Sequence, residues 1–218
     1  MTAPIAIYGA GGLGRELLQV LLEMETPCAG FIVDRDFPAP AAVDGIAVHR
    51  SVDAVACDPA VRFVVALGDP VARARVAAEL ERLIGPRFAT IVHSRTWIGR
   101  NVTIGDGSMV FGLTSVTADA TLGRHVLVNP GTTIAHDCQL GDFATLGPSC
   151  ALAGGVIVEA GAELGIGVRV APGVRIGPRA MVGAGAVCIY PVLADTTVVG
   201  VPARPIIRRE RALQRVET

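Results

Sequence analysis

The stretch LGRHVLVNPGTTIAHDCQLGDFATL, residues 122–146, carries an aliphatic residue at every sixth position. The same spacing extends in both directions, from residue 98 to residue 182, without an exception. Four residues after each aliphatic residue comes Val, Ala, Ser, Thr or Cys, and the residue directly after it is glycine in eight of fifteen hexads. The fifteen aliphatic residues are Ile98, Ile104, Val110, Val116, Leu122, Val128, Ile134, Leu140, Leu146, Leu152, Val158, Leu164, Val170, Ile176 and Val182.

A strict period of six predicts a coiled parallel β-structure, because an α-helix repeats near 3.6 residues and a flat strand at two. Each hexad forms a short strand and a bend, with the aliphatic side chain inward and glycine where φ is positive or space is tight. Three hexads make one coil of a triangular prism, so fifteen make five coils, about 25 Å long in all. A sandwich with chance spacing does not account for an unbroken repeat.

Composition limits the classes of protein to which the chain can belong. The 218 residues are 51% hydrophobic, but no apolar run approaches the roughly 18–20 residues of a membrane span. The first residues lack the basic segment of a secretory signal. Five scattered cysteines without a CxxC pair favour a reduced, cytoplasmic protein over a disulfide framework or a zinc knuckle. The net charge of −1 favours neither nucleic acid nor an anionic membrane as a partner.

Residues 1–85 alternate strand-like and helix-like segments, which predicts a parallel α/β sheet. We expect strands at residues 5–10, 29–34 and 62–68, with amphipathic helices after the first and the third. The predicted domain limits are 1–85 for this front domain, 86–97 for a linker, 98–190 for the prism and 191–218 for a closing strand and tail. From Arg208 onward we expect a short surface helix or a frayed end.

A glycine motif follows the first expected strand. Gly9, Gly11 and Gly14 fit GxGxxG, and Asp34 follows Gly14 by twenty residues, which is the dinucleotide fingerprint. The glycines of this motif let backbone amides at a helix N-terminus approach a diphosphate. About 85 residues supply only one of the two halves of a dinucleotide fold. The motif therefore favours a nucleotide-diphosphate sugar over NAD(P), and a purely structural glycine turn is the other alternative.

His136 and Asp137 are the candidate catalytic residues. His136 is the third residue of the hexad IAHDCQ, where side chains point outward, and its neighbours one coil away are the small residues Ala118 and Gly154. An imidazole with a pKa near 6.5 can take a proton from an attacking amine or hydroxyl at neutral pH. The adjacent carboxylate would accept from the other ring nitrogen and fix the tautomer. A solvated surface histidine is the alternative for His136 and the favoured interpretation of His125.

Four segments together resemble the hexapeptide-repeat sugar acetyltransferases of the sialic-acid O-acetyltransferase and UDP-bacillosamine N-acetyltransferase family: YGAGGLGRE, ALGD, AHDC within the repeat, and the closing VLADTTVVGVPARPI. The resemblance implies an α/β Rossmann-like domain followed by a left-handed parallel β-helix, assembled as a homotrimer with active sites between protomers. The implied activity is acetyl-CoA-dependent N-acetylation of a nucleotide-linked amino sugar in bacterial glycan biosynthesis. Acetyl-CoA is then a co-substrate, and no separate cofactor or metal is required.

The resemblance also implies roles for particular residues. His136 aligns with the family's catalytic base and Asp137 with the acidic residue beside it, whereas Leu13 and Thr145 stand where members often have histidine. The positions implied for the nucleotide sugar are Gly11, Gly12, Gly14, Asp34, Arg35, Gly68, Asp69 and Asn129. Those implied for acetyl-CoA are Thr145, Gly154, Ile166 and Arg204, and the backbone N–H of Gly154 would donate to the developing oxyanion.

Three other functions fit parts of the sequence. A sugar hydroxyl could be the acceptor, as in sialic-acid O-acetylation, because one histidine would serve an amine or a hydroxyl. A non-enzymatic nucleotide-sugar-binding scaffold would bind ligand without releasing thiol from acetyl-CoA. A metal hydrase on a similar prism is disfavoured, because its zinc site needs three converging histidines and the repeat has two, on different faces.

Overall fold

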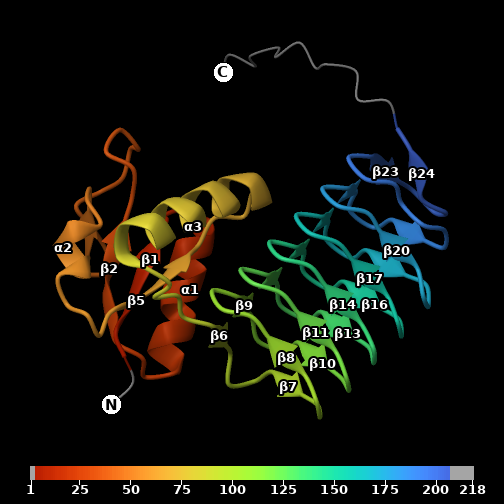
Figure 1. Cartoon of the computed structure of the whole chain (residues 1–218), viewed down its shortest axis with the longest axis horizontal. Coiled ribbons are helices and arrows are strands. Elements are labelled where there is room, and N and C mark those ends of the chain that lie inside the picture. Colours follow the sequence, from red (N-terminus) through yellow and green to blue (C-terminus); the bar gives the residue numbers. More distant parts are fainter. Residues whose placement is uncertain (1–2, 207–218) are drawn as a thin grey trace.

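The computed structural model describes residues 3–206, so the tail expected from Arg208 onward lies outside the described residues. Within this range an α/β front domain is followed by a three-sided parallel β-helix, which we call the prism (Figure 1). The predicted fold class, a Rossmann-like domain followed by a parallel β-helix, is confirmed.

The front domain is a five-stranded sheet in the order β3-β4-β2-β1-β5, parallel except for the β3–β4 pair. Ile5 and Ile7 pack with helix α1, and Ala6 and Tyr8 with helix α3, because successive residues of a strand face opposite sides. The sequence predicted β1, β2, β5, α1 and α3 but not β3, β4 or α2. The elements are β1 Ile5–Tyr8, α1 Gly12–Glu23, β2 Cys28–Ile32, β3 Ala42–Val43, β4 Ile46–His49, α2 Asp53–Ala56, β5 Arg62–Val65 and α3 Pro70–Ile84.

The prism consists of strands of two or three residues, and all except β24 pair in parallel with the strand one coil away. They are β6 Ile91–Val92, β7 Trp97–Ile98, β8 Thr103–Ile104, β9 Met109–Val110, β10 Ser115–Val116, β11 Thr121–Leu122, β12 Leu127–Val128, β13 Thr133–Ile134, β14 Gln139–Leu140, β15 Thr145–Leu146, β16 Ala151–Leu152, β17 Ile157–Val158, β18 Glu163–Leu164, β19 Arg169–Val170, β20 Arg175–Ile176, β21 Met181–Val182, β22 Val187–Cys188, β23 Thr197–Val199 and β24 Arg204–Pro205.

These strands form three faces. The first face contains β7, β10, β13, β16, β19 and β22; the second contains β8, β11, β14, β17 and β20; the third contains β6, β9, β12, β15, β18, β21, β23 and β24. Ile134 pairs with Leu152, eighteen residues on, as three hexads per coil require. From Val110 to Val182 every aliphatic residue of the repeat is buried in one continuous core, while Ile98 and Ile104 pack against its end.

Glycine meets two different requirements in the bends of the repeat. The third residue after each aliphatic residue has a positive φ in all fifteen hexads, and only seven of these residues are glycine. The glycines directly after the aliphatic residue are required by space instead. A Cβ on Gly99 would lie 2.6 Å from the carbonyl oxygen of Thr117 in the next coil. Tight space and positive φ therefore act at different positions of the hexad.

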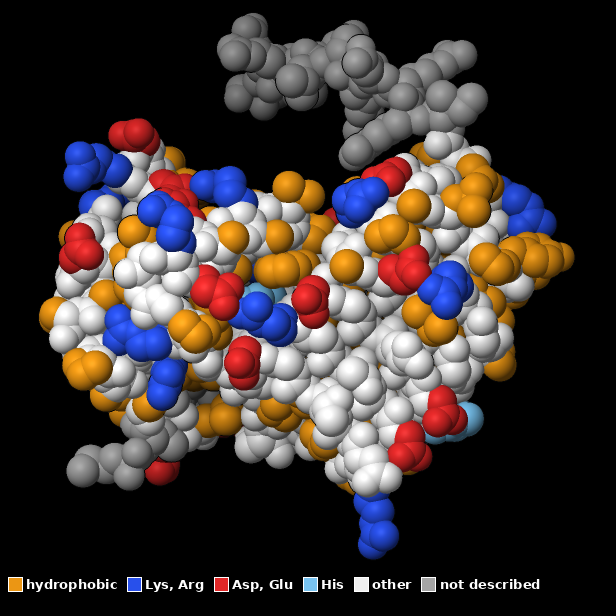
Figure 2. All heavy atoms as spheres, viewed as in Figure 1, with side chains coloured by type: hydrophobic (Ala, Val, Ile, Leu, Met, Phe, Trp, Pro, Cys, Tyr) orange, Lys and Arg blue, Asp and Glu red, His pale blue; other side chains and the backbone are white. Residues whose placement is uncertain are grey.

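The prism begins earlier than the sequence predicted. Strand β6 lies inside the segment expected to be a linker, yet it pairs in parallel with β9 and belongs to the third face. At the other end β23 extends the same face and β24 returns antiparallel to it. Hydrophobic side chains gather at this end of the molecule (Figure 2), where Ile189, Tyr190 and Leu193 are exposed.

The front domain packs on the third face of the prism. Met109, Phe111 and Leu127 share one apolar cluster with Leu18 and Leu21 of α1. Charged side chains of both signs lie on the junction between the two parts (Figure 2). Two ion pairs cross it, one between Glu81 and Arg124 at 3.0 Å and one between Glu23 and Arg95 at 3.3 Å, and His93 Nε2 lies 3.0 Å from Glu23 Oε2, within hydrogen-bond distance.

His125 is buried at this junction, and the prediction of a surface residue was wrong. Its side chain is 1% exposed. The ring stacks on Phe143 with 5.0 Å between centroids and meets Phe88 edge-on at 4.5 Å. Desolvation lowers the pKa of His125 from 6.5 to about 4, and the positive charges of Arg124 and Arg73 add to this shift. The hexad period does not reveal which coils the front domain covers.

Burial of neutral His125 predicts a pH dependence of stability. The unfolded chain binds the proton near pH 6.5 and the folded chain only near pH 4, so the free energy of unfolding falls as the pH falls through this range. The whole change is roughly 3 kcal/mol. His125→Asn should remove this part of the slope, because asparagine does not titrate and tolerates the positive φ found here. Urea unfolding between pH 4 and 7 measures both slopes, and equal slopes would contradict the assignment.

Candidate functional site

His136 and Asp137 form a hydrogen-bonded pair on the corner between the first and second faces. Asp137 Oδ2 lies 2.7 Å from His136 Nδ1. An ionised carboxylate only accepts hydrogen bonds, so Nδ1 carries the proton and Nε2 is left as the basic nitrogen. The two side chains are 67% and 64% exposed. The ring therefore points outward, as expected, with its tautomer set by the neighbouring residue.

The backbone of the repeat places this carboxylate. Asp137 is the positive-φ residue of its hexad, with φ of 60°. Aspartate is one of the few residues other than glycine that adopts this conformation with ease. Its N–H donates to the carbonyl oxygen of Ala118 in the preceding coil at 3.1 Å. The positive-φ position of this hexad therefore also supplies the carboxylate that pairs with the imidazole of His136.

Gly154 leaves room for the ring. A Cβ at this position would lie 2.5 Å from Cε1 and 2.6 Å from Nε2 of His136. The next residue, Gly155, donates its N–H to the carbonyl oxygen of His136 at 2.8 Å, which joins the two coils. His136, Asp137 and Gly154 are therefore brought together, in the arrangement that the sequence predicted.

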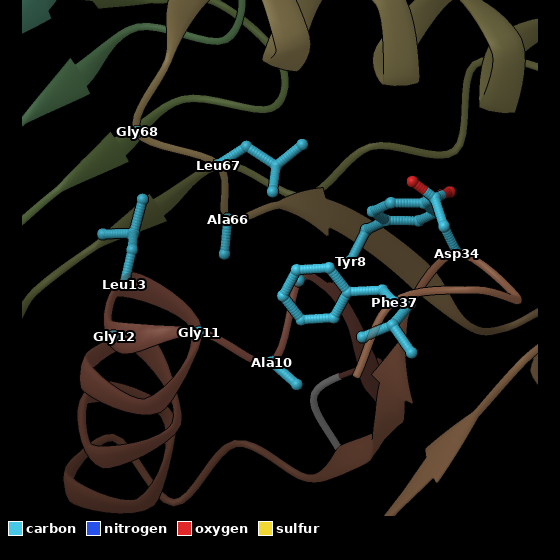
Figure 3. Close-up of a pocket in the computed structure, with 12 residues that line it drawn as sticks. Tyr8, Ala10, Gly11, Gly12, Leu13, Asp34, Phe37, Ala66, Leu67 and Gly68 are labelled. Carbon is cyan, nitrogen blue, oxygen red and sulfur yellow. The ribbon is translucent and has the colours of Figure 1, made fainter. Parts of the chain in front are cut away.

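A cavity of about 240 Å³ lies at the carboxyl ends of β1, β2 and β5 (Figure 3). In open α/β sheets, ligands bind at this edge, at the point where the strand order reverses. Here that point is β1, which has β2 on one side and β5 on the other. Four predicted residues, Gly11, Gly12, Asp34 and Gly68, line it, with Leu13 at the end near Gly68. The other lining residues are Gly9 of the glycine motif and six to which the sequence assigned no role: Tyr8, Ala10, Val33, Phe37, Ala66 and Leu67.

The two ends of this cavity differ in chemistry, and one of them suits an anion such as a diphosphate. Helix α1 begins here at N-cap Gly11 without a side-chain cap or an acidic residue in its first turn, so its first N–H groups can receive an anion. At the opposite end Tyr8 donates its hydroxyl to Asp34, beside the ring of Phe37. Desolvation, followed by the hydrogen bond to Asp34, raises the pKa of Tyr8 above its ordinary value, so the hydroxyl stays neutral. Arg75 Nη2 lies 4.0 Å from Asp34.

Three other predicted residues of the front domain do not line the cavity. A Cβ on Gly14 would lie 1.9 Å from the carbonyl oxygen of Gly9, so this glycine lets helix α1 pack against the turn. The carboxylate of Asp69 caps helix α3, accepting from the N–H of Ala72 at 2.7 Å. Arg35 is exposed.

The other residues predicted in the prism lie on separate corners. Asn129 and Ile166 share the corner between the third and first faces; Asn129 donates to the carbonyl oxygen of Leu146 at 2.8 Å, and Ile166 is exposed. Arg204 lies in β24, with its guanidinium 5.2 Å from the ring of Tyr190. Within one chain, neither the corner with Asn129 and Ile166 nor strand β24 with Arg204 is the corner that carries His136.

Thr145 differs from the expectation of an acetyl-CoA contact. Its side chain lies on the third face beneath the front domain and is 6% exposed. Its hydroxyl accepts a hydrogen bond of 2.7 Å from Arg73, a residue of helix α3. The hydroxyl is therefore part of the contact between the front domain and the prism.

Comparisons with known proteins agree with this architecture. The model of the PglD N-terminal domain matches residues 4–80. GDP-perosamine N-acetyltransferase of Escherichia coli O157:H7 is 31% identical over 165 residues, which cover 73% of this chain and 74% of that protein. The chain belongs to the hexapeptide-repeat sugar acetyltransferases. It is an acyltransferase that uses acetyl-CoA.

Solved structures of this acetyltransferase family superpose over almost the whole chain. PerB from Caulobacter crescentus, in complex with CoA and GDP-perosamine, is 30% identical with a TM-score of 0.86, covering 95% of this chain and 99% of that one. WeeI from Acinetobacter baumannii is 30% identical with a TM-score of 0.84, covering 93% and 99%.

Two features are absent from residues 3–206 of this acetyltransferase. No helix there is both long and apolar enough to cross a bilayer. In the same range, no three His, Cys, Asp or Glu side chains gather where they could hold a metal ion.

Proposed function

We propose that the protein transfers the acetyl group of acetyl-CoA to the amino group of a nucleotide-linked sugar, with His136 as the general base. The observation that carries this proposal is the pair in which Asp137 holds Nδ1 and leaves Nε2 basic on an open corner. Two relatives support the acceptor class, since one is a GDP-perosamine N-acetyltransferase and another was solved with CoA and GDP-perosamine. GDP-perosamine is therefore the first acceptor to test.

The proposed mechanism is direct transfer. The sugar amine attacks the thioester carbonyl, a C–N bond forms, and Nε2 of His136 takes the proton that the amine loses. The carboxylate of Asp137 stabilises the resulting imidazolium. The backbone N–H of Gly154 donates to the tetrahedral oxyanion. As the C–S bond breaks, the imidazolium returns its proton to the thiolate of CoA.

We further propose that the active site forms between protomers of a homotrimer. The front domain packs on the third face, whereas His136 lies on the opposite corner, between the first and second faces. The cavity and the imidazole of one chain are thus on different sides of its prism. Asn129 and exposed Ile166 lie on the corner between the third and first faces, which would meet the His136 corner of a neighbouring protomer. Light scattering after gel filtration measures the mass of the assembly, and a monomer would contradict this arrangement.

The remaining assignments complete the proposal. Gly11, Gly12, Asp34 and Gly68 would bind the nucleotide, and Ile166 and Arg204 would contact acetyl-CoA, which is consumed as a co-substrate. We place the reaction in bacterial glycan biosynthesis in the cytoplasm, where all five cysteines remain the free thiols that the structure shows.

A thiol-release assay tests the proposed function. With acetyl-CoA, we expect turnover of GDP-perosamine and background rates with free sialic acid. A GDP-linked sugar with a hydroxyl in place of the amine is the matched control and should also stay at background. Turnover of the hydroxyl acceptors alone would establish an O-acetyltransferase. Binding of each nucleotide sugar without any thiol release would establish a scaffold.

A further inference from the structure

Arg73 is an arginine in the interior of the molecule. It lies in the second turn of helix α3 and is 0% exposed. It shares the buried stripe of this helix with Val76, Ala77 and Leu80, at the i, i+3, i+4 and i+7 positions. A charged residue at such a position is rare unless its charge or its hydrogen bonds are used.

The guanidinium of Arg73 makes five hydrogen bonds, all to neutral acceptors. Nε donates to the carbonyl oxygen of His125 at 3.0 Å, Nη1 to those of Leu67 at 2.6 Å and Gly68 at 2.9 Å, and Nη2 to that of Phe143 at 2.8 Å and to Thr145 Oγ1 at 2.7 Å. Desolvation lowers the pKa of Arg73 to about 10, so the group still carries its charge at neutral pH. A guanidinium holds its donors in a rigid plane, which fixes its five acceptors relative to one another.

These acceptors come from both parts of the molecule. Leu67 and Gly68 form the turn after β5 and line the cavity of the front domain. His125, Phe143 and Thr145 belong to two successive coils of the prism. One side chain thus joins the wall of the cavity to the β-helix. The other ion pairs and side-chain hydrogen bonds between helices of the front domain and the prism, those of Glu81 with Arg124 and of Glu23 with His93 and Arg95, involve helix positions away from this turn.

We propose that Arg73 is a positioning residue for the nucleotide-sugar site: it holds the Leu67–Gly68 turn against the prism and thereby keeps the cavity in its binding shape. This inference rests on the proposed function, because it takes the cavity as the nucleotide site. It also explains why the hydroxyl of Thr145 faces the front domain.

Arg73→Lys is the decisive variant. Lysine keeps the charge, but a single ammonium with three donors cannot reach all five acceptors. We expect the KM for GDP-perosamine to rise at least about 10-fold, while the KM for acetyl-CoA stays within about twofold. Hydrogen exchange of the amides at residues 66–69 should become faster. Glu81→Gln is the matched control: it weakens another contact of the same helix with the prism and should change neither KM nor this exchange.

The outcomes separate this inference from the proposed function. Absence of turnover by the wild-type protein would reject the function itself. With an active wild type, an unchanged KM for GDP-perosamine in folded Arg73→Lys would reject the positioning role, as would an equal rise of both KM values. If Arg73→Lys does not fold, Thr145→Val removes only one acceptor and keeps the shape of the side chain. It should raise the KM for GDP-perosamine about threefold and speed exchange at residues 66–69, and no change in either would overturn the proposal.

Discussion

His136→Ala should lower kcat at least about 100-fold while leaving the melting temperature nearly unchanged. The ring is 67% exposed and its side-chain hydrogen bond is to Asp137, so its removal opens no cavity in the core. A general base contributes about 10²- to 10⁴-fold, and no other histidine lies on this corner to replace it. Thiol release with saturating acetyl-CoA and GDP-perosamine gives kcat, and thermal unfolding gives the stability.

Asp137→Asn provides the graded comparison for this variant. Asparagine adopts the positive φ of this position, so the bend is kept, but it no longer accepts as a charged group from Nδ1. We expect a smaller fall in kcat than for His136→Ala and the same fold. Near-normal turnover by His136→Ala would mean that another group removes the proton. A large loss of stability would show that the residue is structural.

The prism could be predicted almost completely, because its period is a direct consequence of its packing. An aliphatic residue every six positions fills a three-sided core, and a residue such as Ile134 must then lie above its counterpart eighteen positions away. The start of the prism could not be predicted in the same way. β6, at residues 91–92, completes the third face before the repeat becomes regular, and only its pairing with β9 reveals this.

The site could be predicted where it depends on local sequence. His136, Asp137 and Gly154 lie on adjacent coils at a spacing that the repeat dictates. The junction of the two domains depends on long-range packing, so the burial of His125 and Thr145 could not be predicted from the period. One signal was present: Arg73 interrupts the apolar stripe of a helix, and an arginine there indicates a buried hydrogen-bonding role.

Tyr8 shows a second limit of the sequence. It is the last residue of β1, directly before the glycine turn, and strand alternation places it on the α3 side of the sheet. Its hydroxyl reaches Asp34 from the neighbouring strand end, twenty-six residues away in the chain. The glycine motif predicted the end of the cavity at the start of α1, and its twenty-residue spacing predicted Asp34 at the other end, but no short motif includes Tyr8 or Phe37 beside it.

Gly154→Ala should impair catalysis without harming the fold. The added Cβ would lie 2.5 Å from Cε1 of His136, a distance that no real contact tolerates, and the exposed ring can move into solvent. That movement would break its 2.7 Å hydrogen bond to Asp137 and displace Nε2. Because a displacement of about 1 Å at a reacting group can cost 10²-fold, we expect kcat to fall about 10- to 100-fold. Thiol-release kinetics and thermal unfolding of the same sample measure both effects.

Gly155→Ala, at the next residue, should have the opposite pattern. Gly155 has a φ of 69°, where an alanine costs about 1–2 kcal/mol, but a Cβ there meets only Gly173 Cα, at 3.9 Å. This variant should unfold at a lower temperature and keep most of its kcat. If Gly154→Ala instead retained full activity, the imidazole would not need its place above this glycine. The arrangement of His136 over the next coil would then be irrelevant to the transfer, and the base would have to be sought elsewhere.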